Sequence, residues 1–192
     1  MDFDWHKVWL RKGTEETEDL VRLNGYEKTN IDPGLVADQI KKIFSLNAES
    51  RVLEIGCGAG MIAQFLDCNY VGVDYSETLV EKIKNILKVE AFVSHVNELP
   101  FEDNSFDYVF AYSVFHYFPN RNYANETIKE MTRVARKSIF IGDLPEYSHD
   151  RNHLLFSLKE FPDWIASNGF YNDKRFNIFK RIHKLWIANV DK

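Results

Sequence analysis

The sequence has little of several features that would place it in a specialised class of protein. Only two cysteines, Cys57 and Cys68, occur among 192 residues, which is too few for a framework of several disulfides. No apolar run reaches the roughly 20 residues that span a membrane. The first residues, Met1 to Trp5, carry acids in place of a basic segment followed by an apolar stretch. We therefore expect a cytoplasmic protein that does not associate with membranes.

Basic residues are also too few for a protein that binds nucleic acid through its phosphates. Lys and Arg number 24 against 29 Asp and Glu, which gives a net charge of −5. Short basic pairs such as Lys41-Lys42 are interleaved with acids, as on solvated helix faces. His149, Asp150 and His153 superficially suggest a metal site, but without a further candidate ligand we expect no metal.

The remaining composition is that of one soluble globular domain. Apolar residues make up 45% and charged residues 28% of the chain, and this length is typical of a single folding unit. We expect one domain over residues 1–192, with a helical cap or lid at 1–32 and an α/β core at 33–192. From residue 51 onward, buried strands alternate with amphipathic helices, which predicts a mostly parallel sheet.

The expected elements follow from periodicity and turn residues. Strands are predicted at 51–55, 69–74, 90–94, 106–113 and 137–143, and an antiparallel pair at 175–182 and 184–190. Helices are predicted at 5–12, 33–44, 60–66, after Ser76, at 123–134 and at 160–168.

A glycine-rich turn, Gly56-x-Gly58-x-Gly60, follows the strand at 51–55. Such a turn before a helix lets a ligand approach backbone amides closely. A nicotinamide fingerprint would have glycine at the sixth position, where this chain has Met61, and there is no Lys-Ser or Lys-Thr pair for nucleotide phosphates. The turn therefore suits an adenosine with a small charged tail better than a diphosphate.

Asp74 ends the next strand, about twenty residues after the glycine turn begins, where a carboxylate can accept both hydroxyls of a ribose. The alternative is that Asp74 only caps the following helix, a role that Ser76 could fill alone.

Four motifs together resemble the class I S-adenosylmethionine-dependent methyltransferases, in the branch that acts on small molecules and includes ubiquinone-type enzymes. The resemblance covers roughly residues 36–169, and it implies a Rossmann-like fold with a seven-stranded, mostly parallel sheet, helices on both faces, and S-adenosylmethionine as cofactor. The motifs are Glu54-x-Gly56-x-Gly58-x-Gly60, Val71-Gly72-Val73-Asp74-Tyr75-Ser76, Leu99-Pro100-Phe101 and Ser105-Phe106-Asp107-Tyr108-Val109.

The resemblance also assigns roles to residues. Glu54 and the glycine turn would hold the methionine part of the cofactor, Asp74 the ribose, and Tyr75 the adenine. The family often has an acid where this chain has His95, so the resemblance gives adenine no side-chain partner there. The full set of expected cofactor residues is Glu54, Gly56, Cys57, Gly58, Gly60, Asp74, Tyr75, Ser76, Asn97, Glu98, Leu99, Ala111 and Tyr26.

Candidates for contact with the reacting groups follow the strand at 106–113. By the same resemblance, Tyr112 and His116 border both cofactor and acceptor, and His116 has a pKa range suited to a general base. A structural histidine packed at a helix start is the equal alternative for His116. Tyr26 is a candidate lid residue, whereas Trp5 and Trp9, four residues apart, are better explained as packing.

The expected reaction is direct displacement of a methyl group from the sulfonium to an O or N atom of a small-molecule acceptor, which needs alignment and exclusion of water but no nucleophilic side chain. Residues 144–159 would help to shape the acceptor pocket. A methyltransferase acting on protein or RNA, and a non-catalytic cofactor-binding module, remain alternatives.

Overall fold

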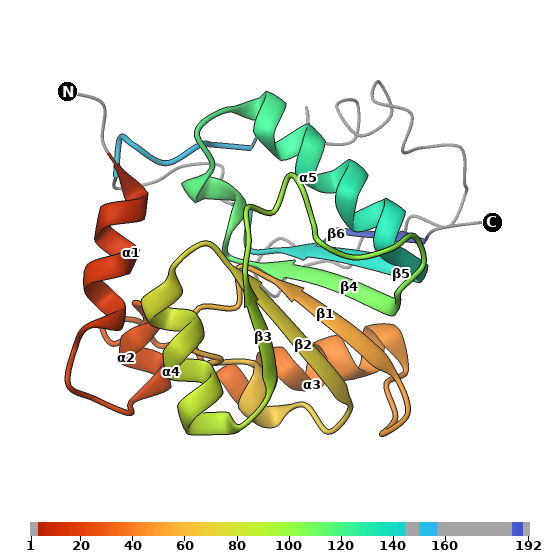
Figure 1. The fold of residues 1–192 in the computed structure, drawn as a ribbon, viewed down its shortest axis with the longest axis horizontal. Coiled ribbons are helices and arrows are strands. Elements are labelled where there is room, and N and C mark those ends of the chain that lie inside the picture. Colours follow the sequence, from red (N-terminus) through yellow and green to blue (C-terminus); the bar gives the residue numbers. More distant parts are fainter. Residues whose placement is uncertain (1–3, 145–149, 157–185, 190–192) are drawn as a thin grey trace. The chain divides into compact units, whose positions relative to one another are not determined.

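The structure is a computed structural model that describes residues 4–144, 150–156 and 186–189, the last of these as backbone. The chain divides into two compact units, which we call unit 1 (Met1–Pro100) and unit 2 (Phe101–Lys192). Figure 1 labels their helices and strands. Each unit is described separately below.

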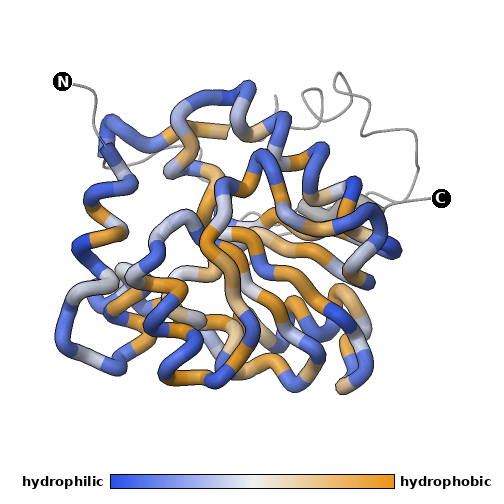
Figure 2. The backbone as a smooth tube through the Cα atoms, in the orientation of Figure 1, coloured by the Kyte–Doolittle hydropathy of each residue, from blue (hydrophilic) through white to orange (hydrophobic). Residues whose placement is uncertain are grey.

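The sheet of unit 1 has three parallel strands, β1 (Arg51–Ile55), β2 (Asn69–Asp74) and β3 (Glu90–Val93), with β2 in the middle. All but the first residue of β1 and of β2 are buried, as expected for parallel strands covered on both faces. Figure 2 shows hydrophobic residues along these strands. Because the strands run in one direction, the glycine turn after β1 and Asp74 at the end of β2 share one edge of the sheet.

Helices of unit 1 begin at side-chain caps. Ser76 caps α4 (Glu77–Leu87), which packs on β2 and β3, and Asp32 caps α3 (Pro33–Phe44), which packs against the 3₁₀ turn η1 (Ala63–Phe65). Asp4 caps α1 (Trp5–Gly13), which lies beside α4 (Figure 1). Contact between α1 and α4 is so close that a Cβ on Gly13 would lie 2.2 Å from the Thr78 hydroxyl.

Unit 2 contains a parallel pair, β4 (Phe106–Tyr112) and β5 (Ala135–Gly142), joined by the 3₁₀ turn η2 (Phe115–Tyr117) and the helix α5 (Arg121–Val134). As predicted, α5 buries Ile128, Met131 and Val134, and it packs on both strands. The strand β6 (Trp186–Asn189) pairs antiparallel with β5.

The structure confirms most predicted elements, corrects one and adds one. The predicted helix at 60–66 is wrong, because Gly60 has φ = +93° and only η1 forms before the chain turns toward β2. The four-residue helix α2 (Leu20–Leu23) was not predicted, since four residues carry too little periodicity.

Strand number is the other point of difference. We expected seven strands, and the described residues form six, β1 to β6. The predicted strand 175–182 lies outside the described residues, as does the helix 160–168, so the predicted pairing of 175–182 with 184–190 is not described. None of the helices in the described ranges is long and apolar enough to cross a membrane.

Candidate functional site

The backbone amides of the glycine loop, residues 56–60, all donate hydrogen bonds within the protein. An anion such as a diphosphate binds to a turn of this kind through amides that are free to donate. Our expectation that a ligand would use these amides is therefore revised. The five bonds run from Gly56 and Cys57 to the Val73 carbonyl (2.8 and 3.0 Å), from Gly58 to Asp74 Oδ2 (2.9 Å), from Ala59 to Asn24 Oδ1 (3.1 Å) and from Gly60 to the Cys57 carbonyl (3.0 Å).

The three glycines of the loop have positive φ angles of 67°, 52° and 93°, but different neighbours. Gly56 is half-buried, so a ligand can approach it, whereas Gly58 and Gly60 are buried. A Cβ on Gly58 would lie 2.4 Å from Asn24 Nδ2, and one on Gly60 would lie 2.7 Å from Leu87 Cδ1. Gly58 and Gly60 therefore make room for protein side chains, which leaves Gly56 as the glycine open to a ligand.

Asp74 is held in one orientation by the backbone on both sides. Its Oδ2 accepts from Gly58 and its Oδ1 accepts from the Ser76 amide, each at 2.9 Å. Burial raises the pKa of the carboxyl, and the backbone donors and the nearby His6 act in the opposite direction. A carboxylate has about four acceptor positions, so acceptor capacity remains for a ribose.

Ser76 is fully buried and supports this arrangement through its hydroxyl, and its predicted contact with the cofactor stays a prediction. Its hydroxyl lies 3.3 Å from the Trp9 carbonyl and caps α4 through the Leu79 amide. The cap of α4 is Ser76 and not Asp74. The alternative considered above, that Asp74 only caps this helix, therefore does not hold.

Glu54 is buried in β1 beside a tyrosine that the sequence analysis did not identify. The Tyr70 hydroxyl donates to Glu54 Oε2 at 2.6 Å. This reach is possible because Gly72, opposite Glu54 on β2, has no side chain; a Cβ there would lie 3.0 Å from the Tyr70 oxygen. Burial raises the pKa of Glu54 to about 8, although the Tyr70 bond lowers it and nearby Asp74 raises it further.

Cys57 contributes to the loop through its backbone. Its side chain is fully buried and points toward Gly72, where a Cβ would lie 2.7 Å from the sulfur. Burial raises the pKa of the thiol, which keeps it protonated.

The turn after β3 adjoins the same sheet edge, since the Ser94 amide donates to the Asp74 carbonyl at 2.9 Å. Leu99 is buried, Asn97 is half-buried, and Glu98 and His95 are exposed. Leu99 can thus offer an apolar surface to adenine. The predicted cofactor contacts of Asn97, Glu98 and Leu99 stay predictions.

The N-terminal segment contacts the site region partly through Asn24 and His6, which the sequence analysis did not single out. Trp9 packs with the core cluster that contains Leu20 and Leu23, as the packing interpretation predicted. Asn24, two residues before Tyr26, bonds to the glycine loop, and the lid role of Tyr26 stays a prediction. The ring of His6 lies edge-on to Tyr75, with centroids 4.9 Å apart. His6 was missed because it lies 69 residues from Tyr75 in sequence.

In unit 2, β4 ends with buried Ala111 and Tyr112. The Tyr112 ring packs over Gly142, where a Cβ would lie 2.8 Å from it. Its hydroxyl is buried and has no hydrogen-bond partner among the described residues. Burial raises the pKa of this phenol, so Tyr112 offers a neutral O–H.

His116 is buried in η2, and its Nδ1 likewise lacks a partner within the described part of the chain. Its ring lies 4.7 Å from that of His153, and its carbonyl accepts from the Leu154 amide at 2.8 Å. Burial, with a smaller effect of His153, lowers the pKa of His116 to about 3. A neutral imidazole of this kind is a good hydrogen-bond partner and a weak base.

No group of metal-ligating side chains that could hold an ion occurs among residues 4–144 and 150–156. His149 lies outside the described residues, so its part in the suggested cluster with Asp150 and His153 is not described.

Comparison with known proteins places this site in a family. Residues 53–141 match the family model described as a methyltransferase domain. The chain is similar to sterol 24-C-methyltransferase erg6 of Schizosaccharomyces pombe (38% identity, 32% of this chain, 19% of that protein). It is also similar to probable tRNA methyltransferase 9B of Homo sapiens (38% identity, 44% of this chain, 19% of that protein). The chain thus spans about a fifth of the length of these two relatives.

Two solved structures share the fold. The YcgJ protein of Bacillus subtilis superposes with a TM-score of 0.59 at 25% identity, covering 69% of this chain and 66% of that one. Magnesium protoporphyrin IX methyltransferase of Synechocystis, solved with bound S-adenosylmethionine, superposes with a TM-score of 0.61 at 15% identity, covering 95% and 88%. The fold is the α/β Rossmann-like methyltransferase fold with a parallel sheet. Residues 53–141 form a methyltransferase domain of the class I, S-adenosylmethionine-dependent family, which confirms the family and the cofactor predicted from the sequence.

Proposed function

We propose that this protein transfers a methyl group from S-adenosylmethionine to an O or N atom of a small-molecule acceptor. The observation that carries the proposal is the pairing of a fixed carboxylate, Asp74, with a glycine loop whose amides are all occupied. Such a loop offers no donor to a diphosphate, whereas the acids Glu54 and Asp74 suit a ligand with hydroxyl groups and an ammonium.

Unit 1 would bind the cofactor through three contacts. Asp74 accepts from the ribose hydroxyls, Glu54 faces the ammonium of the methionine part, and Gly56 allows the chain of that part to pass close to the backbone. When bound, the cofactor supplies an electrophilic methyl group. The proton that the acceptor atom loses on methylation would pass to water, because the described residues supply no strong base.

Unit 2 would supply contacts to the acceptor. The Tyr112 hydroxyl can donate and His116 can either donate or accept, and both are buried without a partner among the described residues. Because His116 is a weak base, we assign it a binding and orienting role in place of the general-base role first considered. An acceptor that arrives unprotonated, such as a neutral amine, needs no stronger base.

A tRNA acceptor is the second candidate, since probable tRNA methyltransferase 9B is among the relatives. The net charge of −5 opposes it, because phosphate recognition relies on clustered Lys and Arg.

A cytoplasmic location also stays a prediction.

The test is formation of S-adenosylhomocysteine during incubation with S-adenosylmethionine and three separate panels: small amines and hydroxyl compounds, peptides, and RNA. Turnover with the first panel supports the proposal, and turnover with RNA or peptides alone contradicts it. Cofactor binding without turnover on any panel would favour a non-catalytic module.

A further inference from the structure

Asn24 connects the N-terminal segment to the glycine loop through both ends of its carboxamide. Its Nδ2 donates to the Cys57 carbonyl at 3.3 Å, and its Oδ1 accepts from the Ala59 amide at 3.1 Å. Only an amide side chain provides a donor and an acceptor at this spacing. We call this pair of bonds the Asn24 bridge.

The Asn24 bridge surrounds Gly58, since it binds the residue on either side. The Gly58 amide in turn donates to Asp74 Oδ2 at 2.9 Å. A side chain at Gly58 would collide with Asn24, because a Cβ would lie 2.4 Å from Nδ2. The bridge thus fixes the peptide that orients the carboxylate expected to hold ribose.

Asn24 itself is held by buried neighbours. It follows α2, and its amide donates to the Leu20 carbonyl at 3.1 Å. Leu20 and Leu23 are buried in a cluster with Ala59 and Leu79, so α2 packs against the loop that Asn24 binds. Burial of two leucines removes enough apolar surface from water to anchor a short segment.

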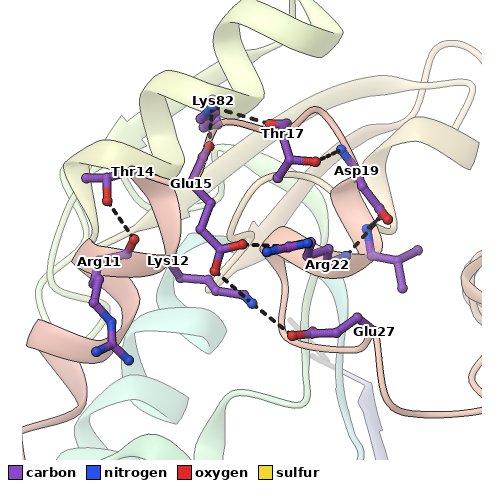
Figure 3. Close-up of polar contacts among 10 residues, drawn as sticks. Arg11, Lys12, Thr14, Glu15, Thr17, Asp19, Arg22, Glu27 and Lys82 are labelled. Carbon is purple, nitrogen blue, oxygen red and sulfur yellow. Dashed lines mark hydrogen bonds and ion pairs between the residues drawn. The ribbon is translucent and has the colours of Figure 1, made fainter.

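Polar contacts attach the segment before Asn24 to α4 as well, as Figure 3 shows. Lys82 of α4 donates to the carbonyls of Glu15 (2.9 Å) and Thr17 (3.3 Å), and the Glu15 carboxylate pairs with Arg22 at 2.7 Å. Surface ion pairs contribute little to stability, because water screens the charges. The leucines and the bridge therefore determine the position of Asn24 more than the ion pairs do.

We propose that Asn24 is a positioning residue of the cofactor site: its carboxamide closes the Ala59 amide to anions and holds Gly58 so that Asp74 faces the ribose. The inference rests on the proposed function in that the ligand of this loop is S-adenosylmethionine. It adds a residue from outside the matched methyltransferase domain to the residues that determine cofactor affinity.

The test compares Asn24→Ala with Asn47→Ala in the full chain. Asn47 is a matched control because its side chain also makes two hydrogen bonds in unit 1, accepting from the Glu49 amide (3.0 Å) and the Ser50 hydroxyl (3.1 Å), but before β1. Calorimetric titration with S-adenosylhomocysteine should show about a tenfold or greater loss of affinity in Asn24→Ala, and a change under about twofold in Asn47→Ala. At saturating cofactor, kcat should stay within about twofold of wild type while KM for the cofactor rises.

A second readout is independent of activity. Hydrogen exchange of the Ala59 amide, measured without ligand, should be faster in Asn24→Ala than in wild type or Asn47→Ala. If Asn24→Ala does not fold, Asn24→Asp keeps the acceptor for Ala59 but loses the donor to Cys57, and it should give an intermediate affinity.

The titrations can contradict the proposal in two ways, which can be told apart. If wild type binds S-adenosylhomocysteine, and Asn24→Ala binds it as tightly as wild type or no more weakly than Asn47→Ala, the proposed role of Asn24 alone is overturned. Wild type that does not bind S-adenosylhomocysteine overturns the proposed function and this inference together.

Discussion

The glycine loop of unit 1 and the segment that follows β4 in unit 2 differ in how their buried polar groups are satisfied. Around the glycine loop of unit 1, the amides of residues 56–60 and the carboxylates of Glu54 and Asp74 have partners in the protein. In unit 2, the Tyr112 hydroxyl and His116 Nδ1 have none among the described residues. An unpartnered buried polar group costs roughly 1–3 kcal/mol, which a ligand can recover. The glycine loop therefore presents a fixed frame to its ligand, and the segment after β4 retains polar groups for one.

In each unit a buried titratable group has a shifted pKa, and the two shifts run in opposite directions. Glu54 has a raised pKa and His116 a lowered one, so both are neutral at pH 7 without ligand. A cation beside Glu54 favours its ionised form, whereas a hydroxyl or amine beside His116 requires no change of charge. Cofactor binding should thus release a proton, and acceptor binding should not.

The largest expected effect is on Asp74→Ala. Loss of two hydrogen bonds from a charged acceptor, together with the bond that orients Gly58, should weaken binding of S-adenosylhomocysteine about a hundredfold or more. Calorimetry measures the change. Asp38→Ala, which removes an exposed acid of unit 1 paired with Lys41, is the control and should bind as wild type does. Equal affinity in the two variants would leave Asp74 as a structural residue.

The next effect is the pH dependence set by Glu54. Affinity should fall by up to about tenfold for each pH unit below the pKa of about 8, because the acid must ionise to hold the ammonium. Glu54→Gln should bind more weakly at pH 8.5 and lose this dependence. Titrations in buffers of different ionisation enthalpy measure proton release, and equal release by both proteins would refute the assignment.

Stability should follow opposite trends in the two units. The raised pKa of Glu54 contributes stability that is present below the ordinary glutamate pKa of 4.5 and is lost as pH rises through about 8. The lowered pKa of His116 contributes stability that is present above 6.5 and is lost as pH falls through about 3. Thermal unfolding from pH 4 to 9 should show Glu54→Gln flattening the alkaline side and His116→Gln the acid side. A wild-type slope that survives both substitutions would exclude these groups as its source.

Smaller effects are expected from Tyr112→Phe. Loss of one neutral hydrogen bond should raise KM for the acceptor roughly fivefold and leave cofactor affinity within about twofold. Tyr108→Phe, on the same strand and only half-buried, is the matched control. A loss of cofactor affinity in Tyr112→Phe would remove the distinction between the two units.

Much of unit 1 could be predicted because its signals are local. Strand bounds at 51–55 and 69–74, and the cap at Ser76, follow from apolar runs and from residue types with one favourable local role. The helix at 60–66 failed because the pattern does not reveal that Gly60 takes a left-handed conformation.

Long-range partners could not be predicted in the same way. Asn24 lies 33 residues from Cys57, and Tyr70 lies 16 residues from Glu54, so no local spacing marks either contact. The sequence did contain a signal for Tyr70. Gly72, two residues later on the same strand, has no side chain and so leaves space for the tyrosine hydroxyl. The glycine motif indicated a cofactor loop, but the structure was needed to separate Gly56, open to a ligand, from Gly58 and Gly60.

The most direct measurement is calorimetric titration of the wild-type chain with S-adenosylhomocysteine and, separately, with NAD. The loop has no free amide for a diphosphate, and its acids suit an ammonium and a ribose, so we expect binding of S-adenosylhomocysteine with release of a proton near pH 7 and no binding of NAD. Tight binding of NAD with no response to S-adenosylhomocysteine would contradict the account.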